Sequence, residues 1–437
     1  MNKPLCIVSS PVDTFSGYGA RSRDFIKSLI KAKGDEWDIK LLSQRWGSTP
    51  FGFLDDEIEE EADLKSRIID TGNQLPIQPD VWFQITVPNE FQKMGKHLSI
   101  GVTAGIETTI CDPSWIEGCN RMDLILASSE HSKTVFENSQ FEQKDKNSNK
   151  TTAIIKLTSP VETLFEGVDL NKYFKTTPSQ TDLVQQISKI KEDFAFLFVG
   201  HWLQGDFGED RKNVGYMVKA FLEVFKGKTN PPALIMKTNS ATTSIMDRNS
   251  MFEKIESIRK TVSGRLPNIY LLHGDLEDED INDLYNHSKV KAMVSFTKGE
   301  GFGRPLLEFT VTEKPVIASG WSGHIDFLNK DAAVLVGGEL KQIHASAVVP
   351  NMLIADSQWF APNDGQAGYA LKEVFENYKK FIPLAKKQAN ISKNKFSLDK
   401  MTERLSQILN EKTQPIPKFI PLSLPKLNQL ELPKLNK

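Results

Sequence analysis

The sequence is poor in cysteine, in net charge and in long apolar runs. Its three cysteines, Cys6, Cys111 and Cys119, are odd in number and are not spaced as metal ligands, which predicts free thiols in a reducing compartment. A formal net charge of -2 excludes a strong overall attraction to nucleic acid. The apolar run at 5–10 is too short for a signal sequence or a membrane span. We therefore expect a cytoplasmic protein without a transmembrane segment, which could meet a membrane only peripherally, at its surface.

Short apolar runs alternate with amphipathic stretches along most of the 437 residues, a length that suits two or three domains. This alternation predicts an α/β fold with parallel sheets covered by helices. The predicted strands of the first half are 5–10, 38–42, 81–86, 100–104, 124–128 and 153–155. Those of the second half are 194–199, 233–236, 269–272, 292–296, 315–318 and 333–336.

The two series of strands predict two Rossmann-like domains that face each other across a cleft. We assign residues 1–180 to an N-terminal, acceptor-side domain and 191–385 to a C-terminal domain that binds the donor. A helix at about 386–410 should return to the first domain, because its apolar residues are spaced to pack on a core. Ligands of such sheets bind at the carboxyl ends of the strands.

Two segments stand apart from this pattern. Residues 137–152 are almost all polar, which predicts a surface excursion. Residues 411–437 carry five lysines against two glutamates, and their prolines block a helix. We expect this tail to be extended and to dock on a partner chain or a surface.

The strongest chemical signal is a glycine-rich turn between a buried strand and a helix, at 295–308. Pro305 is predicted as the first helical residue, where its missing N–H costs nothing. The amides of Phe302, Gly303 and Arg304 would then point out of a helix N-terminus, where a pyrophosphate fits. Gly301 and Gly303 would let the backbone approach such a ligand closely.

Two glutamates frame this turn. Glu308 falls about one turn into the helix, where its carboxylate could accept the hydroxyls of a ribose, and Glu300 lies nearer to a donor sugar. The pair resembles the E-x7-E signature of retaining GT-B glycosyltransferases, specifically family 4. Other stretches between about residues 5 and 410 resemble the same family, namely 166–169, 212–221, 314–318 and 321–324.

The resemblance implies transfer of a sugar from a nucleoside-diphosphate sugar, with retention of configuration and without a metal or other cofactor. The acceptor stays open among a glycan, a lipid, a protein and modified DNA. The family's lysine matches Lys212, and its N-domain loop that faces the donor matches Gly17 and Gly19. Glu107 occupies about the place of the family's acceptor-side histidine.

The sequence departs from the family after the first strand of the second domain. There the family has an arginine, whereas here Gly200 is followed by His201. Two alternatives follow: the phosphate-binding role passes to Arg211, or it is lost. Lys212 and Arg211 would stabilise the departing diphosphate, together with the turn amides, and Lys212 should line an open cleft. With Glu300, these two residues form the predicted catalytic set.

Other interpretations remain open at this point. Asp278–Asp280 contains an Asp-x-Asp pattern, but acidic residues also favour the first turn of a helix, which is our interpretation here. His324 is equally compatible with a sugar contact and with packing. An epimerase of nucleotide sugars can share the two-domain fold, and a non-catalytic assembly protein could act through the tail. Intact Glu300, Lys212 and Glu308 favour the transferase.

Overall fold

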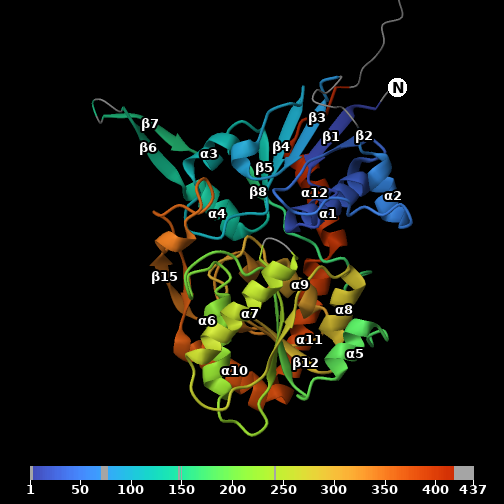
Figure 1. Ribbon diagram of the computed structural model, residues 1–437. Coiled ribbons are helices and arrows are strands. Elements are labelled where there is room, and N and C mark those ends of the chain that lie inside the picture. Colours follow the sequence, from blue (N-terminus) through green and yellow to red (C-terminus); the bar gives the residue numbers. More distant parts are fainter. Residues whose placement is uncertain (1–2, 70–76, 146–147, 149, 241–242, 418–437) are drawn as a thin grey trace, which may run out of the picture.

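The computed structural model describes residues 3–69, 77–145, 148, 150–240 and 243–417. The chain forms two α/β lobes, one above the other in Figure 1. Each lobe is built on a six-stranded sheet, and every pairing within these two sheets is parallel. The predicted α/β fold with two Rossmann-like domains is confirmed.

The first sheet has the strand order β2-β1-β3-β4-β5-β8. Its strands are β1 (Leu5–Ser10), β2 (Asp38–Ser43), β3 (Val81–Ile85), β4 (Leu98–Val102), β5 (Leu124–Ala127) and β8 (Val161–Thr163). Alternate residues face opposite sides, so Val8 and Phe83 share a core with α1 (Gly17–Lys33) and α2 (Glu59–Ser66). Ile7 and Trp82 face the side that carries α3 (Pro113–Cys119) and α4 (Glu130–Asn138). The 3-10 turn η1 (Pro88–Glu90) follows β3.

The second sheet has the order β11-β10-β9-β12-β13-β14. Its strands are β9 (Ala195–Val199), β10 (Ala233–Lys237), β11 (Ile269–Leu272), β12 (Val290–Ser295), β13 (Val316–Ser319) and β14 (Val334–Val336). Its helices are α5 (Asp182–Ser188), α6 (Val214–Phe225), α7 (Ile245–Lys260), α8 (Asp278–Asn286), α9 (Arg304–Thr310) and α10 (Asp364–Glu376). Two apolar cores, one on each face, enclose this sheet. All six strands predicted for this half lie in it.

The polar excursion is a β-hairpin, and this corrects one strand of the prediction. Strand β6 (Gln140–Lys144) pairs antiparallel with β7 (Thr151–Lys156), and the pair projects from the first lobe in Figure 1. The strand predicted at 153–155 therefore belongs to the hairpin, and the sixth position in the sheet is taken by β8. A short apolar run indicates a strand but carries no information on which strand it pairs with.

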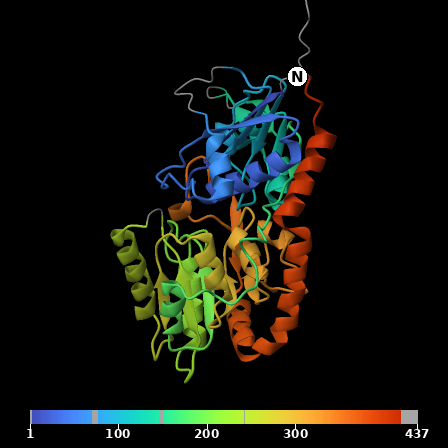
Figure 2. The same cartoon turned by 90° about the vertical axis from the view of Figure 1, so that its right-hand side faces the viewer.

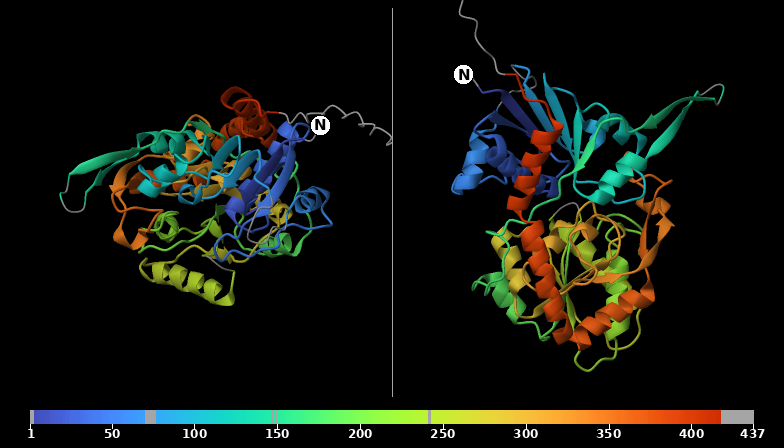
Figure 3. Two further views of the ribbon diagram at one scale, coloured as in Figure 1. Left: turned by 90° about the horizontal axis from the view of Figure 1, so that it is seen from above. Right: turned by 180° about the vertical axis from the view of Figure 1, so that it is seen from behind.

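The chain returns to the first lobe at its C-terminal end, as predicted. Two helices make this passage, α11 (Tyr378–Lys395) and α12 (Leu398–Lys412), and Figures 2 and 3 show both in red along one side of the molecule. Ser397 caps α12, so the predicted single helix is interrupted between residues 395 and 398. Met401 and Leu405 of α12 enter the core that α1 and the first sheet share. Residues 418–437, most of the predicted docking tail, lie outside the described residues.

A second connection between the lobes comes from an arm of the C-terminal domain. Strands β15 (Gly338–Gln342) and β16 (Gln358–Pro362) pair antiparallel, and the arm reaches the first lobe beside α3. The Trp115 indole donates a hydrogen bond to the Asn351 carbonyl at 2.6 Å, and the Thr109 amide donates to the Gln358 carbonyl at 2.9 Å. Among the described residues, no helix is long and apolar enough to cross a membrane.

Candidate active site

The glycine-rich turn lies where the two domains touch. It follows β12 and ends at Gly303, which has a φ of +95° and is the N-cap residue of α9. A Cβ on Gly301 would lie 2.1 Å from the Ala104 carbonyl oxygen, and one on Gly299 would lie 1.9 Å from that of Glu107. Both glycines are thus required because the backbone of the first domain packs on them. Phe302 is buried against Phe327, and α9 begins one residue before Pro305.

Glu300 is held in place by the loop that follows β13. Its amide donates to Ser322 Oγ at 2.9 Å, and its carbonyl accepts from the Gly323 amide at 2.9 Å. Ser322 adopts a φ of +79°, which aligns the loop for both contacts. His324 of the same loop is fully buried and its Nε2 lies 2.6 Å from the Ser319 carbonyl. Its Nδ1 is buried without a hydrogen-bond partner among the described residues, so both interpretations of His324, a sugar contact and packing, stay open.

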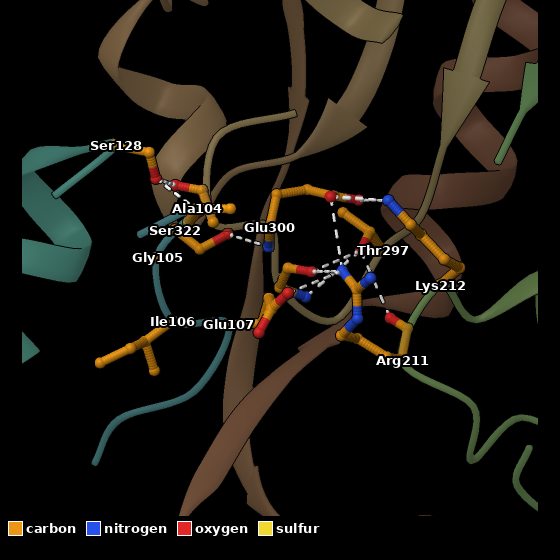
Figure 4. A network of polar contacts seen from close by, with 12 residues as sticks. Ala104, Gly105, Ile106, Glu107, Ser128, Arg211, Lys212, Thr297, Glu300 and Ser322 are labelled. Carbon is orange, nitrogen blue, oxygen red and sulfur yellow. Dashed lines mark hydrogen bonds and ion pairs between the residues drawn. The ribbon is translucent and has the colours of Figure 1, made fainter. Parts of the chain in front are cut away.

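The Glu300 carboxylate is paired with two cations from the segment before α6. Lys212 Nζ lies 2.6 Å from both carboxylate oxygens, and Arg211 NH1 lies 3.4 Å from one of them (Figure 4). Asn213, with a φ of +55°, turns the chain directly after this pair and begins α6. The Glu300 and Lys212 side chains are only 7% and 12% exposed. Lys212 thus lies in a buried ion pair, and our expectation that it lines an open cleft was wrong.

Arg211 links this cluster to the first domain. Its guanidinium donates to the Gly299 carbonyl at 3.0 Å and lies 3.5 Å from Glu107 Oε1 (Figure 4). Burial raises the pKa of Glu300, but the charges of Lys212 and Arg211 outweigh it and lower this pKa to about 2. Burial lowers the pKa of Arg211, yet Glu107 and Glu300 raise it above its ordinary value. Burial lowers the pKa of Lys212, although the charge of Glu300 opposes the shift. With its pKa at about 2, Glu300 is ionised at neutral pH.

A second cluster surrounds Arg304 and Glu308. Arg304 Nε donates to Glu308 Oε1 at 2.9 Å, and its NH1 lies 2.5 Å from Asp24 on α1 and 3.9 Å from Glu166. The other Glu308 oxygen accepts from the Tyr285 hydroxyl at 3.3 Å. Burial, with further repulsion from acidic neighbours, raises the pKa of Glu308 to about 7 although Arg304 opposes the shift. Asp24 and Glu166 join this cluster from the first domain. Residues 166–169 belong to a stretch that resembles the family, but no local pattern predicted that Asp24 or Glu166 would lie beside Arg304.

Gly17 and Gly19 lie in the first turn of α1, which follows the carboxyl end of β1. The Gly19 amide donates to Ser16 Oγ at 2.9 Å, and a Cβ on Gly19 would lie 2.3 Å from the Thr14 carbonyl. Gly17 has no neighbouring atom within 4 Å of such a Cβ. Between them, the Tyr18 hydroxyl accepts from the Ala104 amide at 3.2 Å. Ala104 also packs on Gly301, so it links the start of α1 to the glycine-rich turn.

A cavity of about 970 Å³ separates the domains beside these clusters. Phe15, Asp55 and Lys172 line it from the first domain, and Asp278 lines it from the second. Asp278 starts α8, as predicted, and accepts hydrogen bonds from Lys172 at 2.5 Å and from the Tyr173 hydroxyl at 2.7 Å. In the described part of the chain, no group of three or more His, Cys, Asp or Glu side chains is arranged to hold a metal ion.

Comparison with known proteins identifies the fold. No protein-family model matches the sequence, and no curated protein sequence matches it. Solved structures do match, among them a glycosyltransferase from Rickettsia africae with a TM-score of 0.62 and 14% identity, covering 94% of this chain and 99% of that one. Anabaena HepE in complex with UDP-glucose has a TM-score of 0.58 at 14% identity and covers 93% and 99%. Sucrose-phosphate synthase from Thermosynechococcus elongatus has a TM-score of 0.59 at 9% identity and covers 94% and 99%.

One of these neighbours is named as a glycosyltransferase and another as a sucrose-phosphate synthase, and the similarity extends over nearly the whole of both chains. The chain thus has the GT-B fold, with two facing Rossmann-like domains and a C-terminal helix that returns to the first. At identities of 9 to 14% the likeness concerns the fold.

Proposed function

We propose that this chain is a glycosyltransferase that moves a sugar from a nucleoside-diphosphate sugar to an acceptor, with retention of configuration and without a metal. One observation carries the proposal. Glu300, Lys212 and Arg211 of the second domain meet Glu107 of the first domain in a single, largely buried cluster at the domain contact, in which Glu107 is the most exposed side chain at 27%. Such a meeting point of two domains is where an enzyme of this fold brings donor and acceptor together.

The charges of the cluster suit a diphosphate. Lys212 and Arg211 supply two cations in a poorly hydrated place, where charge-assisted hydrogen bonds to phosphate oxygens are strong. In this structure, the Glu300 carboxylate pairs with both cations. When a donor binds, we expect its phosphate oxygens to replace the carboxylate as their partner. Glu300, with a pKa near 2, stays ionised and then accepts hydrogen bonds from hydroxyls of the donor sugar.

The transfer step asks little covalent chemistry of the protein. The bond between the anomeric carbon and the diphosphate oxygen breaks, and the acceptor oxygen forms a new bond to that carbon on the same face of the sugar. The acceptor's proton passes to the leaving phosphate, which leaves with the electron pair of the broken bond. Lys212 and Arg211 would stabilise the charge that grows on the diphosphate. Glu107, which contacts Arg211 from the first domain, would orient the acceptor.

The nucleotide end of the donor would extend toward Glu308. Glu308 is the fifth residue of α9, and a chain of contacts through Tyr285, Tyr173 and Asp278 leads from its carboxylate to the interdomain cavity. To bind a ribose, Glu308 must exchange its contact with Arg304 or Tyr285 for the sugar hydroxyls. The similarity to a protein solved with UDP-glucose makes UDP-sugars the first donors to test.

The test is a donor screen with the purified full chain. Each nucleoside-diphosphate sugar is incubated with and without a mixture of acceptors, and nucleotide release and all sugar products are measured. A transferase releases nucleoside diphosphate and forms a new glycoside, whereas an epimerase changes the sugar without needing an acceptor. Glu300→Gln should abolish the reaction. A screen in which no donor is hydrolysed or transferred, or in which Glu300→Gln is fully active, would refute the proposal.

A further inference from the structure

A second large cavity, of about 960 Å³, lies in the first domain alone. Its floor is one face of the sheet, because Leu42, Ser9, Trp82 and Gln84 alternate with residues that enter the core beside α1. It includes the carboxyl ends of β1 and β3, where the chain order of the sheet reverses. Crevices at such a switch point are preferred ligand sites of open α/β sheets.

The lining of this cavity is unusually rich in amides and indoles. We call this cavity the glutamine groove. Four glutamines and two tryptophans line it, namely Gln44, Gln78, Gln84, Gln92, Trp46 and Trp82. The Gln84 and Trp82 side chains already form hydrogen bonds, since the Trp82 indole N–H and the Gln92 backbone N–H both donate to Gln84 Oε1. The side-chain amides of Gln44 and Gln92 are exposed and form no hydrogen bond with other described residues.

The charges of the groove are nearly balanced. Its cations are Arg45 and Lys93, and its anion is Glu90. Lys93 is paired with Asp123, and the Arg45 guanidinium lies over the Phe51 ring at 5.7 Å. A polyanion such as nucleic acid needs several unpaired cations, which this groove does not offer among its described residues. Free amides each carry donors and an acceptor, which is the hydrogen-bonding pattern that complements hydroxyl groups.

One end of the groove lies close to the proposed reaction centre. The Trp46 indole stacks on Tyr18 with ring centroids 4.1 Å apart, so its remaining face or edge is what lines the cavity. Tyr18 accepts from the Ala104 amide, and the Ala104 carbonyl packs on Gly301, next to Glu300. From Trp46 the groove extends along the sheet face to Gln78 and Met94. Its volume reaches the upper end of the range for small-molecule sites, about 300–1,000 Å³.

We propose that the acceptor is an oligosaccharide, which lies in the glutamine groove with its reacting sugar at the Trp46 end. This inference rests on the proposed function and adds the chemical class of the acceptor. The indole offers an apolar surface to the C–H face of a sugar ring, and Gln44 and Gln92 offer hydrogen bonds to its hydroxyls. The length of the groove favours a chain of sugars over a single one.

The test is direct binding, which needs no turnover. The full chain is applied to an immobilised array of neutral and acidic oligosaccharides, and affinities for the retained ones are measured in solution. The double variant Gln44→Ala/Gln92→Ala should weaken binding about 30-fold, because it removes two hydrogen bonds of about 1 kcal/mol each. Trp46→Ala should weaken it similarly, and Trp46→Phe should restore part of the loss by keeping an aromatic surface.

Two control variants lie on the second domain. Gln186→Ala on α5 and Phe252→Ala on α7 remove an exposed amide and an exposed ring far in sequence from the groove, and neither should change binding. If no oligosaccharide binds, or if the groove variants bind as the wild type does, the proposal fails. It also fails if double-stranded DNA or lipid vesicles bind in the same assay and lose binding in the groove variants. Donor hydrolysis by the wild type tests the proposed function separately.

Discussion

Replacing Lys212 by alanine separates the catalytic from the structural role of its ion pair. The ammonium group is 2.6 Å from both oxygens of buried Glu300, so its removal leaves that carboxylate with Arg211 at 3.4 Å as its remaining cation. Breaking a buried pair costs about 3–5 kcal/mol, and we expect the lower end because Arg211 stays. Loss of one group that stabilises the leaving charge should lower transfer about 10²- to 10³-fold.

The two effects can be told apart with a second substitution. Lys212→Ala/Glu300→Gln removes the unpaired buried charge, so the double variant should regain most of the lost melting temperature but no activity. Lys298→Ala is a matched control. It also removes a buried ammonium group, but Lys298 pairs with Glu209 at 2.8 Å and not with Glu300. Turnover is measured well below the melting temperature of each variant. Near-normal transfer by Lys212→Ala would refute its role, and a double variant as unstable as the single one would refute the buried-charge argument.

Three further outcomes follow from the same geometry. Transfer should persist in excess chelator, because the positive charge comes from Lys212 and Arg211; loss of activity that divalent ions restore would point back to Asp278 and Asp280. The pKa of Glu308 is raised to about 7, so the folded state loses stability as pH rises from the unfolded pKa toward and through 7. The melting temperature of Glu308→Gln relative to wild type should therefore be higher at pH 8 than at pH 5, and a difference independent of pH would contradict this. Truncation after Pro417 should leave the melting temperature and the turnover of a soluble acceptor unchanged, because it spares Ile416, which packs on the core of the first domain; a large loss of stability would show that the tail belongs to the fold.

Most of the fold follows from local sequence patterns. Eleven of the twelve predicted strands lie in the two parallel sheets, because runs of apolar residues bounded by turns indicate buried strands without knowledge of their partners. The twelfth, at 153–155, is a strand of the hairpin, because pairing depends on residues that the local pattern does not contain. Likewise, the break at Ser397 turns one expected helix into two, since its hydroxyl caps a new helix.

The sequence by itself determined the glycine-rich turn, the position of Glu300 before it and of Glu308 within α9, and Lys212 at the start of another helix. These features depend on spacing within short segments, where backbone geometry places residues predictably. Tertiary structure alone decided that Lys212 pairs with Glu300, 88 residues away, and that Arg304 pairs with Asp24, 280 residues away. It also decided that backbone carbonyls of the first domain pack against Gly299 and Gly301. The physical reason is that an ion pair needs only proximity and opposite charge, which many side chains could supply, so the packing of the two domains selects the partners.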